Sequence, residues 1–267
     1  MTPQHQIIVF TYHKTGTTVF ENIFARVSEA WYMPMRKLYG MTPFAPPGPP
    51  ILMLSHSLLG SLPQHDFRAI RAIRDPRDIW VSGYHYHRHC SEPWCRNTDF
   101  SETPSITFPR VPAAFHHHRE RWKRDYLRGL GGRSYQQNLL DRDRDGGLGF
   151  ELDRYTGHTL ESMRAWPHAG PRILDIRMED LAADFDGTMR RVFLHLGFPE
   201  TEIPGLLTLA APDDVGRMTD TALAANPHIH GRNPSRWRSE LTPAQIVAFE
   251  RRYGDVITRF GYTLSGT

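Results

Sequence analysis

Short apolar runs, separated by polar loops, recur along the chain. Four of them predict buried strands, at residues 7–10, 51–54, 67–74 and 172–177. The first, third and fourth runs are each followed by a stretch in which apolar residues recur at helical spacing. Alternating strands and helices are typical of an α/β fold with a central parallel sheet flanked by helices. Because no internal repeat or linker interrupts the pattern, we predict a single domain over residues 1–267.

The loop after the first strand has the composition of a phosphate site. Its backbone N–H groups and the positive end of the helix that follows point at one spot, where a phosphate binds favourably. Lys14 adds a positive charge beside Gly16, and the hydroxyls of Thr15, Thr17 and Thr18 add donors. The order differs from a Walker A motif, because the lysine precedes its glycine and no earlier glycine exists. A threonine-capped helix with an incidental lysine is the alternative interpretation.

Candidate residues also follow the second and third strands. In parallel α/β sheets, ligands bind just beyond the carboxyl ends of the strands, where His56 and Arg74 lie. Asp75 suits a helix cap and Pro76 the first helical turn, so a helix begins here and carries Ser82 on the side of Arg74. A packed or surface histidine and a capped helix with a local salt bridge are the alternatives.

The composition of the chain excludes several classes of function. The net charge of +3 in 267 residues is too small to indicate nucleic-acid binding, and it suits a small anionic ligand. No apolar run is long enough to span a membrane, and the first residues do not resemble a signal peptide. The two cysteines, Cys90 and Cys95, make no disulfide framework. We therefore expect a cytoplasmic protein with reduced thiols.

Two histidine clusters raise the question of a metal. In the first cluster, at residues 84–90, only His85 and His89 are spaced so that both could bind one metal ion from the same side of a helix. Cys90 and Cys95 do not form a CxxC pair. The consecutive histidines at 116–118 would spread their rings around a helix. We therefore expect no metal.

Taken together, these elements resemble the PAPS-dependent sulfotransferases, in particular their bacterial-type members. Lys14-Thr15-Gly16-Thr17-Thr18 is similar to the family's 5′-phosphosulfate loop, which typically reads Lys-Ser/Thr-Gly-Thr-Thr. Residues 74–82 are similar to its 3′-phosphate element. His56 occupies the position of its catalytic histidine, before Leu62-Pro63. The resemblance implies a three-layer, P-loop NTPase-like fold that takes PAPS as co-substrate and releases PAP.

The resemblance also implies roles for individual residues. Lys14 and His56 would be catalytic, His56 as the general base in an in-line sulfuryl transfer. PAPS would be held by residues of three segments: Lys14, Thr15, Gly16, Thr17, Thr18, Arg74, Ser82 and Arg232. The acceptor would be a small molecule with a hydroxyl or amine, bound by the variable region at about 91–170. Candidate acceptor contacts are Tyr135, Phe150, Glu151 and Tyr155, although core packing is the favoured role for each of the aromatic residues.

Three positions depart from the family pattern. Leu54 replaces the lysine of Lys-Thr-His, and Met178 replaces the tyrosine of Tyr-Glu-Asp-Leu. The family's last nucleotide element, Arg-Lys-Gly before a tryptophan, falls on His230, Gly231 and Arg232. These departures keep two alternatives open, a P-loop small-molecule kinase that uses ATP and magnesium, and a non-catalytic nucleotide-binding module. The pattern does not name the acceptor, and a homo-oligomer is compatible with it.

Overall fold

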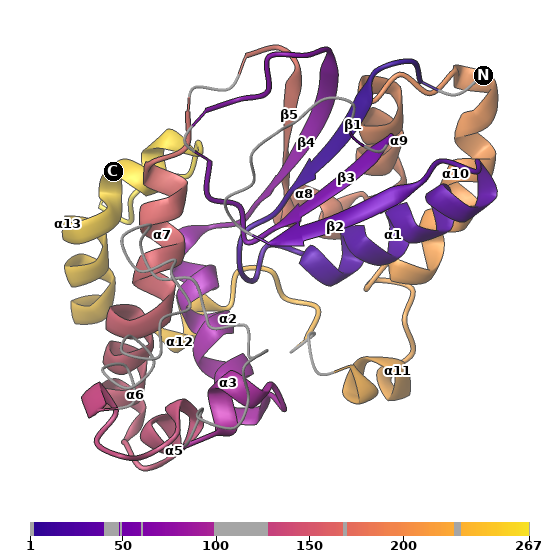
Figure 1. The fold of residues 1–267 in the computed structure, drawn as a ribbon. Helices are drawn as coiled ribbons and strands as arrows, with labels where there is room; N and C mark the ends of the chain where they lie inside the picture. The colour runs from indigo at the N-terminus through magenta and orange to yellow at the C-terminus, as the bar shows by residue number, and fades with distance from the viewer. Residues whose placement is uncertain are drawn as a thin grey trace.

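A five-stranded sheet forms the centre of the part of the chain that the computed structural model describes, residues 3–39, 48, 50–59, 61–98, 128–167, 170–226 and 231–266 (Figure 1). The strands are β1 (Gln6–Phe10), β2 (Met35–Tyr39), β3 (Ile51–Ser55), β4 (Phe67–Ile73) and β5 (Ile173–Arg177). Their order is β2-β3-β1-β4-β5, and every pairing is parallel. The predicted α/β class with a parallel sheet is confirmed.

Strand β2 was not predicted from the sequence. It lies at the edge of the sheet and pairs only with β3. Two of its side chains, Arg36 and Lys37, are exposed, so β2 lacks the continuous apolar run of a strand buried on both faces.

Helices connect and cover the strands. They are α1 (Thr17–Ala30), α2 (Pro76–His89), α3 (Pro93–Arg96), α5 (Tyr135–Leu140), α6 (Arg144–Glu151), α7 (Gly157–Arg164), α8 (Met178–Ala183), α9 (Phe185–His195), α10 (Ile203–Ala210), α11 (Asp220–Ala225), α12 (Trp237–Glu240) and α13 (Pro243–Arg259). Short helical segments are η2 (Leu152–Thr156, π-helical), η3 (Glu200–Glu202) and η4 (Ala211–Asp213). The apolar spacing within residues 148–166 predicts one helix, whereas the structure has α6, η2 and α7 in succession there.

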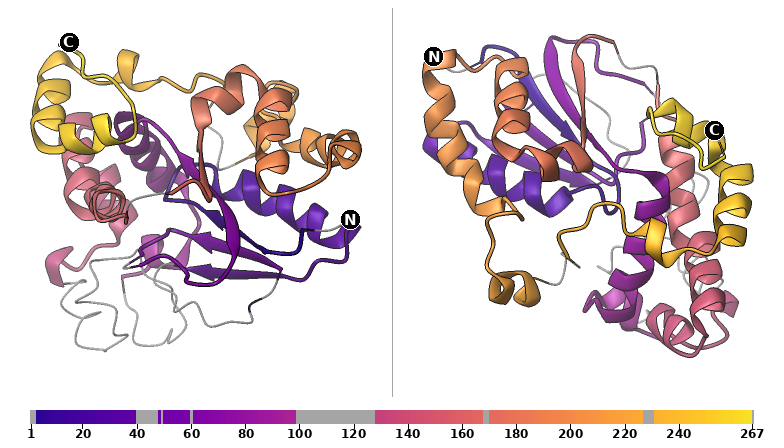
Figure 2. Two further views of the ribbon diagram at one scale, coloured as in Figure 1. Left: turned by 90° about the horizontal axis from the view of Figure 1, so that it is seen from above. Right: turned by 180° about the vertical axis from the view of Figure 1, so that it is seen from behind.

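The sheet is buried on both faces, which gives three layers (Figures 1 and 2). Successive side chains of a strand point to opposite faces. Accordingly, Ile7 and Val9 pack in a core with α1, α9 and α10, whereas Ile8 and Phe10 pack in a second core with α2, α7 and α13. The uninterrupted apolar run that predicted a buried strand therefore contributes side chains to two separate cores, one on each face of the sheet.

Backbone hydrogen bonds join the ends of neighbouring strands. The N–H of Thr11 donates to the carbonyl of Leu54 (3.1 Å), and the carbonyl of Thr11 accepts from the N–H of Ser57 (2.8 Å). The loops that follow β1 and β3 are therefore fixed side by side. Asp75 caps α2 by accepting from the N–H of Arg77 (3.0 Å), as the sequence predicts.

Several expectations fall beyond the described residues. They concern the histidines at 116–118, His230 and residues 99–127 of the expected acceptor region. Within the described ranges, no helix is long and apolar enough to cross a membrane.

Candidate active site

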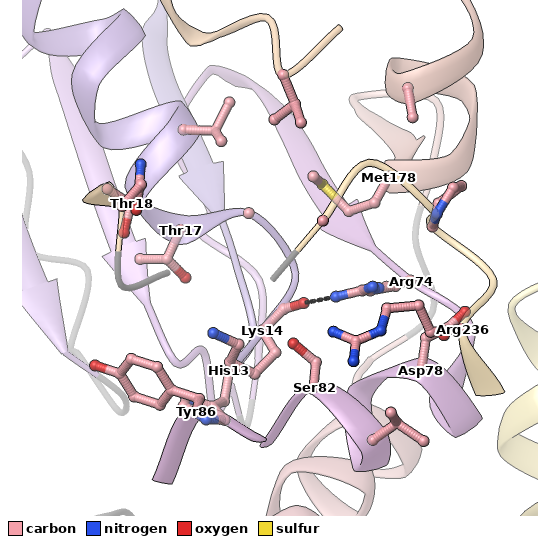
Figure 3. Close-up of a pocket in the computed structure, with 18 of the residues that line it drawn as sticks. His13, Lys14, Thr17, Thr18, Arg74, Asp78, Ser82, Tyr86, Met178 and Arg236 are labelled. Atoms are coloured by element: carbon pink, nitrogen blue, oxygen red, sulfur yellow. Dashed lines mark hydrogen bonds between the residues drawn. The ribbon is translucent and has the colours of Figure 1, made fainter. Parts of the chain in front are cut away.

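A cleft of about 620 Å³ lies at the carboxyl ends of the strands. It collects residues from loops that are far apart in the sequence (Figure 3). Eight of the predicted site residues line it: Lys14, Gly16, Thr17, Thr18, His56, Arg74, Ser82 and Arg232. Thr15 alone does not. The structure thus brings the three predicted segments into one site.

The loop between β1 and α1 is tightly wound. Lys14 and Gly16 both have left-handed backbone conformations, with φ of 62° and 86°. The Thr15 hydroxyl accepts from the N–H of Tyr12 (2.9 Å) and donates to its carbonyl (3.0 Å), so it closes the loop. The hydroxyl thus bonds within the loop, and the role predicted for Thr15 in holding the phosphate stays a prediction. The Thr17 hydroxyl likewise donates to Thr11 Oγ1 (2.9 Å).

Gly16 is required for a second reason. A Cβ atom built on it would lie 2.6 Å from Met178 Sδ, because Met178 packs against the loop from the end of β5. Its neighbour Glu179 accepts a hydrogen bond from the N–H of Asp75 (3.1 Å) and so joins the ends of β4 and β5. Leu54, the other departure from the family pattern, is fully buried in the core on the α2 side.

Lys14 is a half-buried residue of this cleft. Its Nζ lies 4.0 Å from the centre of the Tyr86 ring. The Tyr86 hydroxyl donates to Glu92, which also accepts from the indole N–H of Trp94. Burial, and secondarily the nearby charge of Arg74, lower the pKa of Lys14 to about 7. A bound anion would raise this pKa, because it would favour the charged form.

A second group of polar side chains lies around Arg74 (Figure 3). Arg74 Nη1 donates to the carbonyl of Lys14 (3.4 Å), which links this group to the first loop. Ser82 lies beside it on α2, as predicted. Asp78 is only 1% exposed and accepts from the N–H of Trp237 (3.0 Å). Burial raises the pKa of Asp78 to about 7, although Arg74 opposes the shift.

Arg236 is a cleft residue that the sequence did not identify. It lies just before α12, near Ser82 and Asp78, and pairs with Glu240 (2.5 Å). Arg232, the predicted residue of this loop, instead pairs with the exposed Asp220 (2.7 Å). The sequence feature that could have identified Arg236 is that it is a second arginine in this loop, four positions after Arg232.

His56 lies directly after β3, and its backbone is also left-handed (φ 52°). Its ring packs edge-on against that of His13, with 5.2 Å between centroids. His13 in turn stacks on His87 (4.9 Å, 5° between planes). His87 Nδ1 contacts Glu151 Oε2 at 2.7 Å, and both side chains are fully buried. His13 is a second residue for which sequence reasoning assigned no role.

Of the four candidate acceptor contacts, one lies at the cleft and three do not line it. Tyr155 lines the cleft. Tyr135 and Glu151 are fully buried, and the Tyr135 hydroxyl donates to Glu151 Oε2 (2.9 Å), so packing accounts for both. Phe150 packs against the core and does not line the cleft.

The histidine clusters do not form a metal centre in the described ranges, where no group of three or more His, Cys, Asp or Glu side chains could hold an ion. His85 contacts Glu240 (2.5 Å) and His87 contacts Glu151, which accounts for both rings.

Comparison with known proteins identifies the family and the fold. The model of the sulfotransferase domain matches residues 45–261. The chain belongs to the sulfotransferase domain family. Among solved structures, mouse sulfotransferase SULT7A1 complexed with PAP has a TM-score of 0.53 at 15% identity, covering 95% of this chain and 85% of that one. The predicted family and its P-loop NTPase-like fold are confirmed.

A structure of retinol dehydratase, in complex with androsterone and inactive cofactor PAP, has a TM-score of 0.48 at 14% identity. It covers 98% of this sulfotransferase and 83% of its own chain. A search of curated proteins found no significant match.

The close contact between Gly16 and Met178 predicts a specific loss of stability. Gly16→Ala should destabilise the protein by about 1–2 kcal/mol through its left-handed backbone. Overpacking against Met178 should add at most about 1 kcal/mol to this loss, because the new methyl group meets the end of a flexible, half-buried side chain that can shift. Urea unfolding measures the resulting change in the free energy of unfolding.

Gly131→Ala is the matched control. Gly131 is also left-handed (φ 65°), but nothing lies within 4 Å of its Cβ position. Gly131→Ala should therefore lose only the stability that the left-handed backbone costs. The double variant Gly16→Ala/Met178→Ala should be free of the overpacking that Gly16→Ala introduces. Equal losses for the two single variants would argue against the clash.

Proposed function

We propose that this sulfotransferase transfers the sulfuryl group of PAPS to a hydroxyl or amine of a small-molecule acceptor. The observation that carries the proposal is that Lys14, His56 and the pair Arg74 and Ser82 share one cleft. Its volume of about 620 Å³ is in the range of small-molecule sites. The two solved structures described above hold PAP, the nucleotide that such a reaction releases.

The loop of Lys14 would bind the 5′-phosphosulfate. Its backbone N–H groups and the start of α1 would hold the phosphate, with Gly16, Thr17 and Thr18 lining the site. Lys14 would neutralise the charge that grows on the leaving phosphate oxygen, as preorganised cations do in group transfer. No metal is needed for this step, because the lysine supplies the positive charge.

The 3′-phosphate would bind between β4 and the loop before α12. Arg74 and Ser82 face this space from one side and Arg236 from the other. Charge-assisted hydrogen bonds from arginine to phosphate are strong and geometrically specific. Asp78, with its raised pKa, would be protonated beside a phosphate and would not repel it.

His56 would take the proton of the acceptor. A histidine has a pKa suited to a general base near neutral pH. The aromatic side chains of Tyr86, Trp94 and Tyr155 line the cleft with His56 and would contact the acceptor. Trp94 and Tyr155 lie in the expected acceptor region at about 91–170.

The two alternatives are less well supported. A kinase using ATP and magnesium calls for a Walker A loop, which the order of Lys14 and Gly16 does not provide. A non-catalytic nucleotide-binding module would bind PAP without turnover. A single domain over 1–267, a cytoplasmic location and a homo-oligomer stay predictions.

The base is tested by His56→Ala. The variant should lose roughly 10²–10⁴-fold in turnover while PAP binding is retained, because only proton transfer is removed. The assay incubates the enzyme with PAPS and a set of phenols, alcohols and amines, and detects added SO₃ by mass spectrometry. Unchanged turnover in the variant would reject His56, and PAP binding without any product in the wild type would favour the binding module.

The arginines of the last loop make different predictions. Arg236→Ala should weaken PAP binding by roughly 10- to 100-fold, the equivalent of about 1.5–3 kcal/mol for a charged hydrogen bond. It should barely affect adenosine 5′-phosphate, which lacks the 3′-phosphate. Arg232→Ala should cost both nucleotides the same small amount, because Asp220 holds its guanidinium. Calorimetric titration compares the affinities of both variants for the two nucleotides. A selective loss of PAP binding in Arg232→Ala, with little change in Arg236→Ala, would restore Arg232 as the 3′-phosphate ligand.

Nucleotide binding should depend on pH through Lys14. Its pKa of about 7 in the ligand-free protein would rise beside a phosphate, so binding takes up a proton above about pH 7. PAP affinity is then constant below that pH and falls above it, by at most about tenfold per pH unit for each of the two groups that take up a proton, Lys14 and Asp78. Titration in buffers of different ionisation enthalpy counts the protons. Lys14→Met should remove about one proton of this uptake, and affinity that rises with pH would contradict the assignment.

A further inference from the structure

A small polar recess lies back to back with the cleft. It has a volume of about 20 Å³, which is room for one water molecule. The cleft and the recess share three bordering side chains, His13, His56 and Tyr155. The remaining wall of the recess is formed by Tyr12, Ser57, His158, Thr159 and Ser162. His56 therefore borders the reaction cleft and a second polar space at once.

The wall of the recess is suited to hold a water. The hydroxyls of Ser57 and Ser162 each donate to a backbone carbonyl, of Leu54 (2.7 Å) and of His158 (2.9 Å). Their oxygens keep acceptor capacity for a water. Together with the imidazoles of His56 and His158, they provide the two to four polar partners that an ordered water needs.

His56 borders the open cleft, which the two substrates would fill during the reaction. On its other side, the contacts through His13 run to His87 and Glu151, which are both 0% exposed. A proton passed that way would stay in the core. Across the recess lies His158 on α7, which is half-buried.

We propose that His158 is a proton relay for His56, acting through one water in the recess. This inference rests on the proposed role of His56 as the base. The acceptor O–H bond breaks as its oxygen bonds to sulfur, and the proton goes to one ring nitrogen of His56. The other ring nitrogen of His56 gives its proton to the water, which passes one to neutral His158. His158 then releases a proton to solvent, so no net charge accumulates in the site.

The groups around His158 suit this task. Burial lowers its pKa, the nearby charge of Glu161 opposes the shift and that of Arg154 adds to it. The other titratable side chains that face the recess are Tyr12, His13, His56 and Tyr155. A histidine with a lowered pKa is neutral near pH 7 and, once protonated, returns its proton to water readily.

The test is chemical rescue. His158→Ala should lower the single-turnover rate of sulfuryl transfer roughly tenfold in a weakly basic, bulky buffer, less than the loss expected for the base itself. Added imidazole should restore the rate, because it can enter the space left by the ring and carry the proton. PAP affinity should be unchanged. His158→Phe, which fills that space without a basic nitrogen, should be slow and should not be rescued.

His65→Ala is the control, since His65 lies before β4, contacts Gln6 (2.8 Å) and lines neither the recess nor the cleft. It should react at the wild-type rate with and without imidazole. A wild-type rate for both His158 variants, or a loss that imidazole does not restore in His158→Ala, would overturn the relay. If His56→Ala is also fully active, the base assignment fails instead, so the two failures are distinguishable.

Discussion

Parallel pairing of β3, β1 and β4 is the constraint on which the site depends. It places the carboxyl ends of three strands at one edge of the sheet, so the residues that follow each strand become neighbours. Hydrogen bonds between Thr11 and both Leu54 and Ser57 then lock two of the loops together. Arg74 adds the third by donating to the carbonyl of Lys14. Without this register, Lys14, His56 and Arg74 would be three unrelated polar residues.

Burial gives these residues their chemistry. An exposed lysine would be fully charged at neutral pH, whereas Lys14 lies over Tyr86 with a pKa of about 7. Asp78 has a raised pKa for the same reason, the loss of solvent around a charge. The cleft therefore holds a lysine and a carboxyl that can both take up a proton when an anion arrives. That property suits a site built for a doubly phosphorylated nucleotide.

Sequence reasoning is weakest where side chains have local alternatives. Thr15 belongs to the right motif, but its hydroxyl is used to close the loop onto Tyr12. Counting back from Trp237 selected Arg232, whereas the chain turns so that Arg236 lies beside Ser82. Strand β2 was missed because an edge strand with charged side chains lacks the apolar signature of a central one.

The sequence by itself determined the parallel α/β class, four of the five strands, the tight loop between β1 and α1 and the cap of α2. Each of these depends on a few consecutive residues, through periodicity, glycine conformation and capping, so it can be identified locally. Only the tertiary structure decided that Arg236 lies beside Ser82 in the cleft, that His13 packs between His56 and His87, and that Lys14 is partly buried against Tyr86. Those facts depend on contacts between residues up to about 160 positions apart, such as Asp78 with Trp237, which no local pattern encodes.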